Sequence, residues 1–178
     1  MILTDGNIDS KKIDKLIGKA LMFNWKNRRV VGGVGMFLSS FENKTSSSEK
    51  LKVNSKCNLE IRGKGLLLHS NFSGKRSLVP IVKADILEIK LIRGEEKINP
   101  IPFSRMWILL KLGFSVLQSR YFGLTKQQYS IDSMEMSLKT DSYEMVFNAN
   151  GFLFERQEAF LECLDLGDRL AIIKGFSN

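Results

Sequence analysis

Strict alternation of apolar and polar residues dominates one segment near the C-terminal end of the chain. Residues 133–149, SMEMSLKTDSYEMVFNA, place apolar side chains at every second position on both sides of Thr140-Asp141-Ser142. A period of two is typical of half-buried strands, and the polar residues between the runs supply a turn. The pattern predicts an antiparallel hairpin. A helix is predicted to follow over 152–173, with an apolar stripe formed by Phe160, Cys163, Leu164, Gly167, Leu170 and Ala171.

Shorter runs of the same kind predict five strands upstream of this hairpin, over 30–41, 57–62, 66–70, 77–82 and 86–93. The first run contains Gly32, Gly33 and Gly35, but neither a GxGxxG spacing nor a following GK[ST] is present. A nucleotide-binding loop is therefore not expected. Glycine in such a strand instead permits a bend or a close backbone approach.

Two further segments have helical periodicity. Ser10 can cap a helix to about Asn24, within an N-terminal unit over 1–29. Four lysines lie on its polar face, so the helix can rest on a membrane surface or pack its stripe on its own domain. That stripe is formed by Ile13, Leu16, Ile17, Ala20 and Leu21, opposite Lys11, Lys12, Lys15 and Lys19.

The second helical segment follows a proline-containing stretch, Asn99-Pro-Ile-Pro-Phe103, and is predicted over 104–122 with Ser104 as its cap. Its polar side is narrow, so most of the helix must be buried in the fold, in a partner or in a lipid interface. We take Trp107, Leu110 and Phe114 as the candidate contact residues. The full stripe is Trp107, Leu110, Phe114, Leu117 and Tyr121.

Seven strands followed by one helix resemble the pleckstrin-homology and GRAM-like superfamily. The resemblance is carried by ILEIKL (86–91), KTDSYEMVFNA (139–149) and EAFLECL (158–164), and it covers about residues 57–173. It implies a mainly β fold with helices, in which a seven-stranded barrel or sandwich over 30–178 is capped by the C-terminal helix. The helix near 104–122 departs from the family as an insertion. Functionally, the resemblance implies a noncatalytic module that binds a protein, a peptide or an anionic headgroup.

Positive charge is concentrated in the first third of the chain. The net charge is +8, of which residues 1–56 carry +6 and the other 122 residues carry +2. Such asymmetry favours an anionic partner: a lipid headgroup, a nucleic acid or an acidic protein. Nucleic-acid binding is the alternative function, because Arg28-Arg29 lies close to Phe23 and Trp25. However, no helix-turn-helix, zinc-finger or RNP-type motif accompanies them.

A candidate anion site follows from the expected strand meander. Alternate turns of an up-and-down meander lie at the same end of the sheet, so the loop 42–55 should meet the turn 71–76. In the family, phosphoinositide-binding members carry a tight Lys/Arg pattern across the first two strands, whereas the lysines here are scattered. The meander nevertheless predicts that five cations converge on one rim: Lys44, Lys50, Lys52, Lys75 and Arg76.

Catalytic chemistry has little support in the sequence. The chain has one histidine, His69, and two cysteines, Cys57 and Cys163, which are expected to be reduced thiols. The turn at Gly63-Lys64 sets Cys57 near Ser70 and His69 opposite Asn58, so a Cys57/His69 couple depends on register. HExxH and GxSxG motifs are absent. We therefore expect no enzyme activity, no cofactor and no metal.

The expected location is cytoplasmic. The first residues lack a basic flank and a long apolar core, as a signal peptide would have, and no apolar run approaches the ~20 residues that span a bilayer. Peripheral association with the inner face of an anionic membrane is one version of the binding role, since each clustered Lys or Arg adds about 1 kcal/mol near such a surface.

Overall fold

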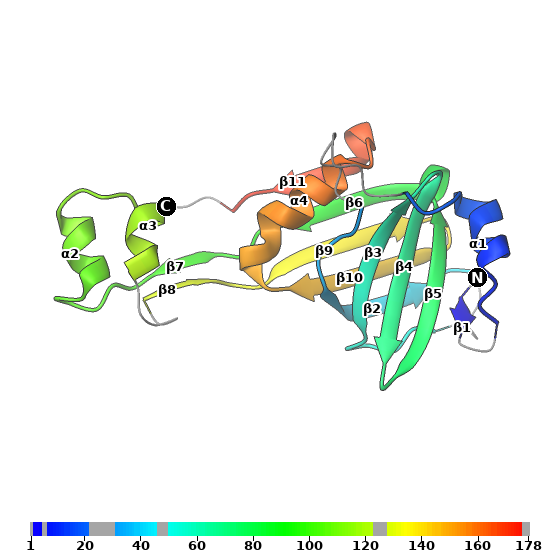
Figure 1. Cartoon of the computed structure of the whole chain (residues 1–178), viewed down its shortest axis with the longest axis horizontal. Helices are drawn as coiled ribbons and strands as arrows, with labels where there is room; N and C mark the ends of the chain where they lie inside the picture. The colour runs from blue at the N-terminus through cyan, green and yellow to red at the C-terminus, as the bar shows by residue number, and fades with distance from the viewer. Residues whose placement is uncertain (1, 5–6, 22–30, 46–49, 123–127, 176–178) are drawn as a thin grey trace.

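A computed structural model describes residues 2–4, 7–21, 31–45, 50–122 and 128–175, and shows a mainly β protein with helices (Figure 1). The strands of the main sheet are β1 (Leu3–Thr4), β2 (Met36–Asn43), β3 (Lys56–Arg62), β4 (Gly65–Phe72), β5 (Lys75–Val82), β6 (Ile86–Ile92), β9 (Met134–Thr140), β10 (Tyr143–Ala149) and β11 (Leu170–Ile173). A second sheet pairs β7 (Glu96–Ile98) with β8 (Tyr129–Ile131). The helices are α1 (Ser10–Ile17), α2 (Arg105–Lys111), α3 (Val116–Ser119) and α4 (Phe154–Glu162), with short 3-10 turns η1 (Lys83–Asp85), η2 (Arg120–Phe122), η3 (Gly151–Leu153) and η4 (Gly167–Arg169).

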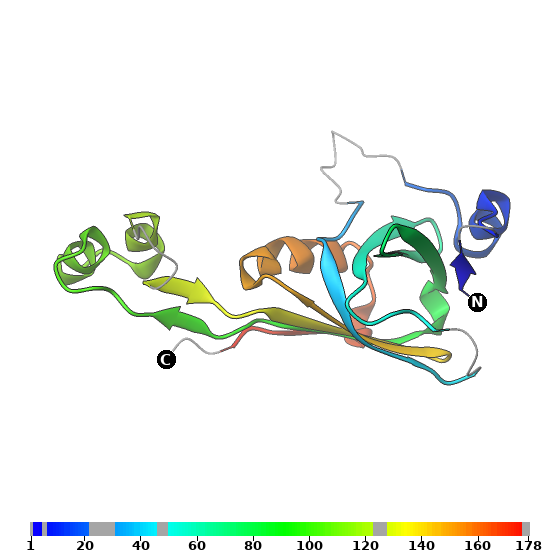
Figure 2. The same cartoon turned by 90° about the horizontal axis from the view of Figure 1, so that it is seen from below.

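The main sheet bends at β2. Its strand order is β1-β5-β4-β3-β2-β10-β9-β6-β11, antiparallel except for the β6/β11 pair. Strand β2 pairs with β3 only through Met36 and Phe37, but it pairs with β10 from Phe37 to Asn43. One strand therefore belongs to two half-sheets, and the sheet folds over itself around an interior (Figure 2).

The apolar side chains at alternate positions of the strands fill this interior. The predicted hairpin over 133–149 is confirmed as β9 and β10, and its apolar positions Met136, Leu138, Met145 and Phe147 are fully buried. Leu59, Leu66, Leu68 and Val79 face them from the other half-sheet, while Phe154, Phe160 and Leu161 of α4 close the open side.

The prediction of one long C-terminal helix is wrong. Helix α4 ends at Glu162, and Asp165 and Gly167 adopt positive φ values of 50° and 58°. The left-handed conformation suits glycine and ends a helix, because a Cβ is crowded there. The chain then continues as β11, which pairs in parallel with the edge of β6. Of the predicted stripe, Phe160 and Leu164 are buried in the core.

The N-terminal helix is shorter than predicted and packs on the outside of the sheet. Asp9 rather than Ser10 caps it, accepting a hydrogen bond from the Lys11 amide at 2.9 Å. It ends at Ile17 because Gly18 adopts φ 81°. Ile13 and Ile17 pack against Leu3, Leu67 and Leu78, so part of the apolar stripe is covered by the chain's own strands, whereas Leu16 is exposed. Residues 22–24 of the predicted helix lie outside the described residues.

The glycine-rich run shows the close approach expected from its sequence. A Cβ on Gly33 would lie 3.1 Å from the Gln157 side-chain oxygen and 3.3 Å from the Phe160 ring. The neighbouring Val34 amide donates to that same oxygen at 2.9 Å. Glycine lets this backbone pass close to α4 without displacing these side chains. The strand itself begins later than predicted, at Met36.

Residues 96–122 and 128–131 form an arm that projects from the body (Figures 1 and 2). The strands β7 and β8 are its stem, and α2, α3 and η2 form its tip. Ser104 caps α2 as predicted, but the helix predicted over 104–122 is broken. It ends at Lys111, Gly113 takes φ 85°, and Ser115 and Gln118 form a capping box that starts α3.

Candidate functional site

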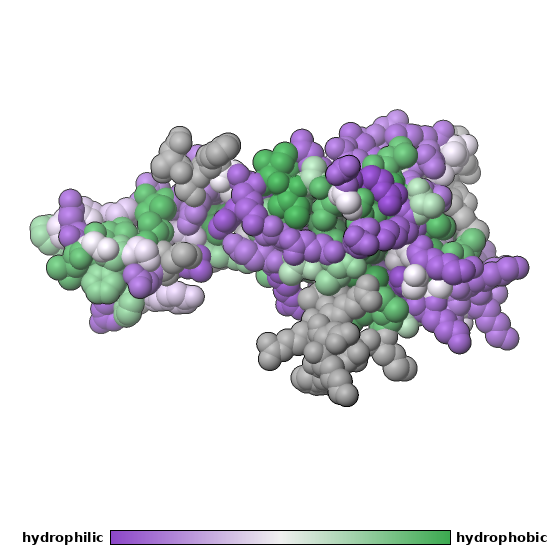
Figure 3. All heavy atoms as spheres, turned by 90° about the horizontal axis from the view of Figure 1, so that it is seen from above, coloured by the Kyte–Doolittle hydropathy of each residue, from purple (hydrophilic) through white to green (hydrophobic). Residues whose placement is uncertain are grey.

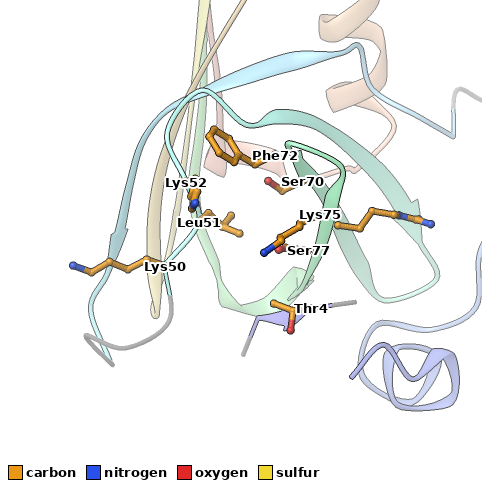
Figure 4. A pocket seen from close by; sticks show the side chains of 9 residues that line it. Thr4, Lys50, Leu51, Lys52, Ser70, Phe72, Lys75 and Ser77 are labelled. Atoms are coloured by element: carbon orange, nitrogen blue, oxygen red, sulfur yellow. The ribbon is translucent and has the colours of Figure 1, made fainter. Parts of the chain in front are cut away.

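The predicted meeting of loop and turn creates a pocket of about 350 Å³, called the rim pocket below. Figure 4 shows Lys75 and Ser77 on one side of its opening and Leu51 and Lys52 on the other. Its lining residues come from β1, from the loop before β3 and from the β4/β5 hairpin: Thr4, Lys50, Leu51, Lys52, Ser70, Phe72, Lys75, Arg76 and Ser77.

The β4/β5 hairpin forms one wall of the rim pocket, and its strand register decides which side chains face the pocket. Ser70 pairs with Ser77 and Phe72 pairs with Lys75, so these four side chains share one face. Ser73 and Gly74 both adopt positive φ, 50° and 81°, which is the geometry of a tight two-residue hairpin turn. The turn therefore places Phe72 and Lys75 as the last cross-strand pair of the hairpin, and both side chains line the pocket.

The opposite wall is a loop held by buried anchors. Leu51 is buried in the main core, and the Ser55 hydroxyl donates to the Lys52 carbonyl at 2.5 Å. The Lys52 ammonium lies 4.8 Å from the centre of the Phe72 ring, a cation–π contact that links the two walls. Lys50 points outward at the edge (Figure 4).

Positive charge is concentrated in the rim pocket. Four of the described lining residues are cationic and none is a carboxylate, while Thr4, Ser70 and Ser77 add hydroxyl groups. Arg76 also lines an adjoining cavity of about 270 Å³ together with Lys56 and His69. An arrangement of ammonium groups and hydroxyl donors around an apolar floor can hold an anion and can reject a cation.

The structure separates Lys44 from the other four predicted residues. Its ammonium lies 3.4 Å from a Glu144 carboxylate oxygen, at the end of β2, and it does not line the rim pocket. The sequence reasoning missed Ser70, Phe72 and Ser77. The strand period could have found them, because positions two apart on a strand share a face with Lys75 or its cross-strand partner.

Cys57 and His69 do not form a catalytic couple. The predicted register is confirmed, with Cys57 opposite Ser70 and His69 opposite Asn58. Cys57 therefore faces the core, where burial raises the pKa of its thiol, although a Ser70 hydrogen bond lowers it in part. His69 faces the other side, and its Nε2 lies 2.8 Å from a Glu60 carboxylate oxygen.

His69 is the first member of a network of polar side chains beneath α1. The same Glu60 pairs with the Arg62 guanidinium at 2.8 Å, and Arg62 pairs with Asp14 of the helix at 3.1 Å. This network ties α1 to the sheet and gives the histidine a structural partner. A group of three or more side chains fit to hold a metal ion is absent from the described part of the chain.

The arm has its own small apolar cluster. Met106, Tyr129 and Ile131 are buried there, with Leu110 and Val116 packed against them. The three candidate contact residues are thus divided: Leu110 packs inward, Trp107 is half-buried against the Phe103 ring, and Phe114 is 48% exposed. A single stripe cannot form, because the break at Gly113 reorients the residues after it.

A polar network ties the arm's stem to its tip. The Tyr129 hydroxyl donates to Glu96 at 2.5 Å and accepts from Arg120 at 3.1 Å. Burial and the Glu96 carboxylate raise the pKa of Tyr129, and the hydrogen bond to Tyr129 raises that of Arg120. The Ser104 hydroxyl also donates to Gln128 at 2.7 Å. These hydrogen bonds hold the tip of the arm on its stem, the β7/β8 pair.

Comparisons of the chain with family models, curated proteins and solved structures find no match. Over the described residues, no helix is both long and apolar enough to cross a membrane. The geometry of the two features described above therefore carries the functional argument.

Proposed function

We propose that this chain is a noncatalytic binding module with a PH-like body, and that its rim pocket binds an anionic, phosphate-bearing headgroup. Strand count and order support the PH-like body. Seven consecutive antiparallel strands form the middle of the nine-stranded bent sheet, with β1 and β11 added at its two edges, and α4 follows the last of the seven in the chain and fills the opening. The strands concerned are β2, β3, β4, β5, β6, β9 and β10.

The convergence of three lysines and Arg76 on one pocket, beside the hydroxyl groups of Thr4, Ser70 and Ser77, carries the proposal. Lys50 and Lys52 arrive from a loop anchored by Leu51, and Lys75 and Arg76 arrive from a hairpin about twenty residues later in the chain. Separate segments thus place like charges side by side. An anion relieves their repulsion, and phosphate oxygens can accept bonds from ammonium and hydroxyl groups together.

A noncatalytic role fits the titratable groups of the described residues. The buried Cys57 thiol has a raised pKa, which keeps it protonated and weakly nucleophilic. His69 is held by Glu60 on another face, away from the thiol. Neither arrangement activates a nucleophile beside the rim pocket.

Calorimetric titration with soluble inositol trisphosphate tests the pocket. The variant Lys50→Gln/Lys52→Gln/Lys75→Gln should lose affinity by about tenfold or more, because one hydrogen bond to a charged group is worth about 1.5–3 kcal/mol. Arg76 is left in place because it also lines the neighbouring cavity. Binding should weaken as salt rises, since the pocket is open to solvent.

The matched control is Lys11→Gln/Lys12→Gln/Lys15→Gln on the exposed face of α1, which removes the same net charge. It should bind the probe as the parent protein does. Equal losses in both variants would show a diffuse charge effect rather than a site. No binding by the parent protein would rule out the phosphate proposal, and titration with an acidic peptide would then test the protein-ligand reading.

A further inference from the structure

The arm tip exposes apolar side chains that the fold does not need. Phe103 is 82% exposed, Tyr121 80% and Leu112 68%. Ile108, Phe114 and Phe122 are also exposed, and Figure 3 shows apolar side chains gathered at this end of the molecule. Isolated apolar residues are common on surfaces, but a cluster of large ones at one end of a protein marks an interaction site.

Phe103 adds an argument from the backbone. It adopts φ 63°, a left-handed conformation that disfavours side chains other than Gly, Asn and Asp. Its ring contacts the Trp107 ring, with centroids 5.3 Å apart, and the residue is otherwise open to solvent. A strained backbone that holds a phenylalanine outward, where glycine would fit with less strain, points to a function for that ring.

Charge identifies what the tip contacts. Residues 97–131 contain five Lys or Arg and no Asp or Glu, although the whole chain has nineteen acidic residues. Arg105 and Lys111 flank the exposed apolar residues on α2 and pair with no carboxylate among the described residues. Aromatic and aliphatic side chains ringed by cations are the composition of a segment that lies in the interface of an anionic bilayer.

The short helices fit shallow insertion. Helix α2 has seven residues and α3 has four, so the tip can enter the headgroup region but cannot cross the hydrocarbon core. The hydrogen bonds of Arg120 and Glu96 with Tyr129 tie η2, which follows α3, to the stem, and the Ser104–Gln128 hydrogen bond ties the start of α2, so the tip meets the membrane in a fixed shape. A preformed tip loses little conformational entropy on binding.

We infer that the arm tip is a membrane-insertion site, which places Phe103, Leu112 and Tyr121 in the interface of an anionic lipid bilayer with Arg105 and Lys111 at the headgroups. This site is separate from the rim pocket and does not rest on the function proposed for that pocket.

Vesicle cosedimentation of the full chain tests the inference, with phosphatidylcholine vesicles compared against phosphatidylcholine–phosphatidylserine vesicles. The variant Phe103→Ser/Leu112→Ser should bind the anionic vesicles at least about tenfold more weakly, because each buried apolar side chain contributes about 1.5–3 kcal/mol. The control Phe37→Ser/Leu87→Ser removes the same residue types from exposed positions on the body, 55% and 52% exposed, and should bind normally.

Tryptophan fluorescence supplies a local readout. In a Trp25→Phe background, Trp107 is the remaining tryptophan, and it lies against Phe103 at the tip. Its emission should shift to shorter wavelength with anionic vesicles and remain unchanged with neutral ones. An unchanged spectrum on bound vesicles would overturn the insertion.

Further outcomes separate this inference from the pocket proposal. Vesicle binding that is lost in Lys50→Gln/Lys52→Gln/Lys75→Gln but kept in Phe103→Ser/Leu112→Ser would support the rim pocket and overturn the insertion at the tip. Absence of vesicle binding by the parent protein, or equal binding to neutral vesicles, would also overturn it. A protein partner captured through the tip residues, without vesicle binding, would replace the bilayer as its target.

Discussion

Glycine is needed at Gly65, where the backbone passes very close to a neighbouring strand. A Cβ on Gly65 would lie 2.1 Å from the Ile81 carbonyl oxygen, a backbone atom that cannot move aside. Gly65→Ala should therefore lower the free energy of unfolding by about 1–3 kcal/mol, as overpacking does. Gly35→Ala is the control, because nothing lies within 4 Å of its added carbon. Urea denaturation of both variants measures the difference, and equal stability would contradict the close approach.

The buried thiol of Cys57 gives a pH-dependent prediction. Burial raises its pKa above the ordinary value of 9.0, so the folded chain holds this proton more tightly than the unfolded chain. The stabilisation is complete below the ordinary pKa and is lost as pH rises from that value through the raised pKa of the folded chain. Between about pH 8 and about pH 10, the parent protein should lose more stability than a Cys57→Ala variant. Parallel stability curves would show that the thiol titrates normally.

Secondary structure followed from the sequence where local spacing decides it. The hairpin over 133–149, the register at Gly63-Lys64 and the cap at Ser104 were all predicted, because each depends on neighbours in the chain. The strand at 170–173 was missed, since its pairing with β6 lies some eighty residues away. Each of the three predicted helices was too long, because apolar spacing continued beyond residues with positive φ at or soon after the helix end: Gly18, Gly113, and Asp165 with Gly167.

The sequence predicted part of the candidate pocket, namely the part that follows from the order of neighbouring strands. Meander geometry brought Lys50, Lys52, Lys75 and Arg76 together, because the ends of alternate strands coincide. It could not exclude Lys44, whose place depends on the Glu144 side chain of a strand about a hundred residues later. Sequence reasoning named Phe114 as a contact residue, and it is exposed, but it did not name Phe103 or Leu112, because the expected continuous helix placed the contact stripe on Trp107, Leu110 and Phe114.

The arm's polar network yields a prediction for that element. Tyr129→Phe keeps the ring in the apolar cluster but removes the hydroxyl that joins Glu96 to Arg120. Stability of the arm should fall by about 1 kcal/mol, the typical worth of such a hydrogen bond. Amide hydrogen exchange should report faster opening in the arm and unchanged protection in β9 and β10. Loss of protection throughout the body would show that arm and body unfold together.

The whole molecule consists of a body and an arm whose apolar clusters share no residue. Among the described residues, the core cluster contains none between Lys97 and Ile131, and within the stem Lys97 of β7 lies opposite Ser130 of β8. Because burial of apolar surface is the main source of stability, the body should not depend on the arm. Because the rim pocket lies on the body and the apolar tip lies on the arm, the two proposed binding features can be tested independently.

Replacing residues 98–129 with Asn-Gly tests this division. The dipeptide favours the two-residue turn that can join Lys97 to Ser130, so the stem becomes a short hairpin. The shortened protein should unfold within about 1 kcal/mol of the parent, because no core contact is removed. It should retain binding of inositol trisphosphate and lose binding to anionic vesicles. An unfolded product would show that the arm supports the core, and undiminished vesicle binding would move the membrane contact to the body.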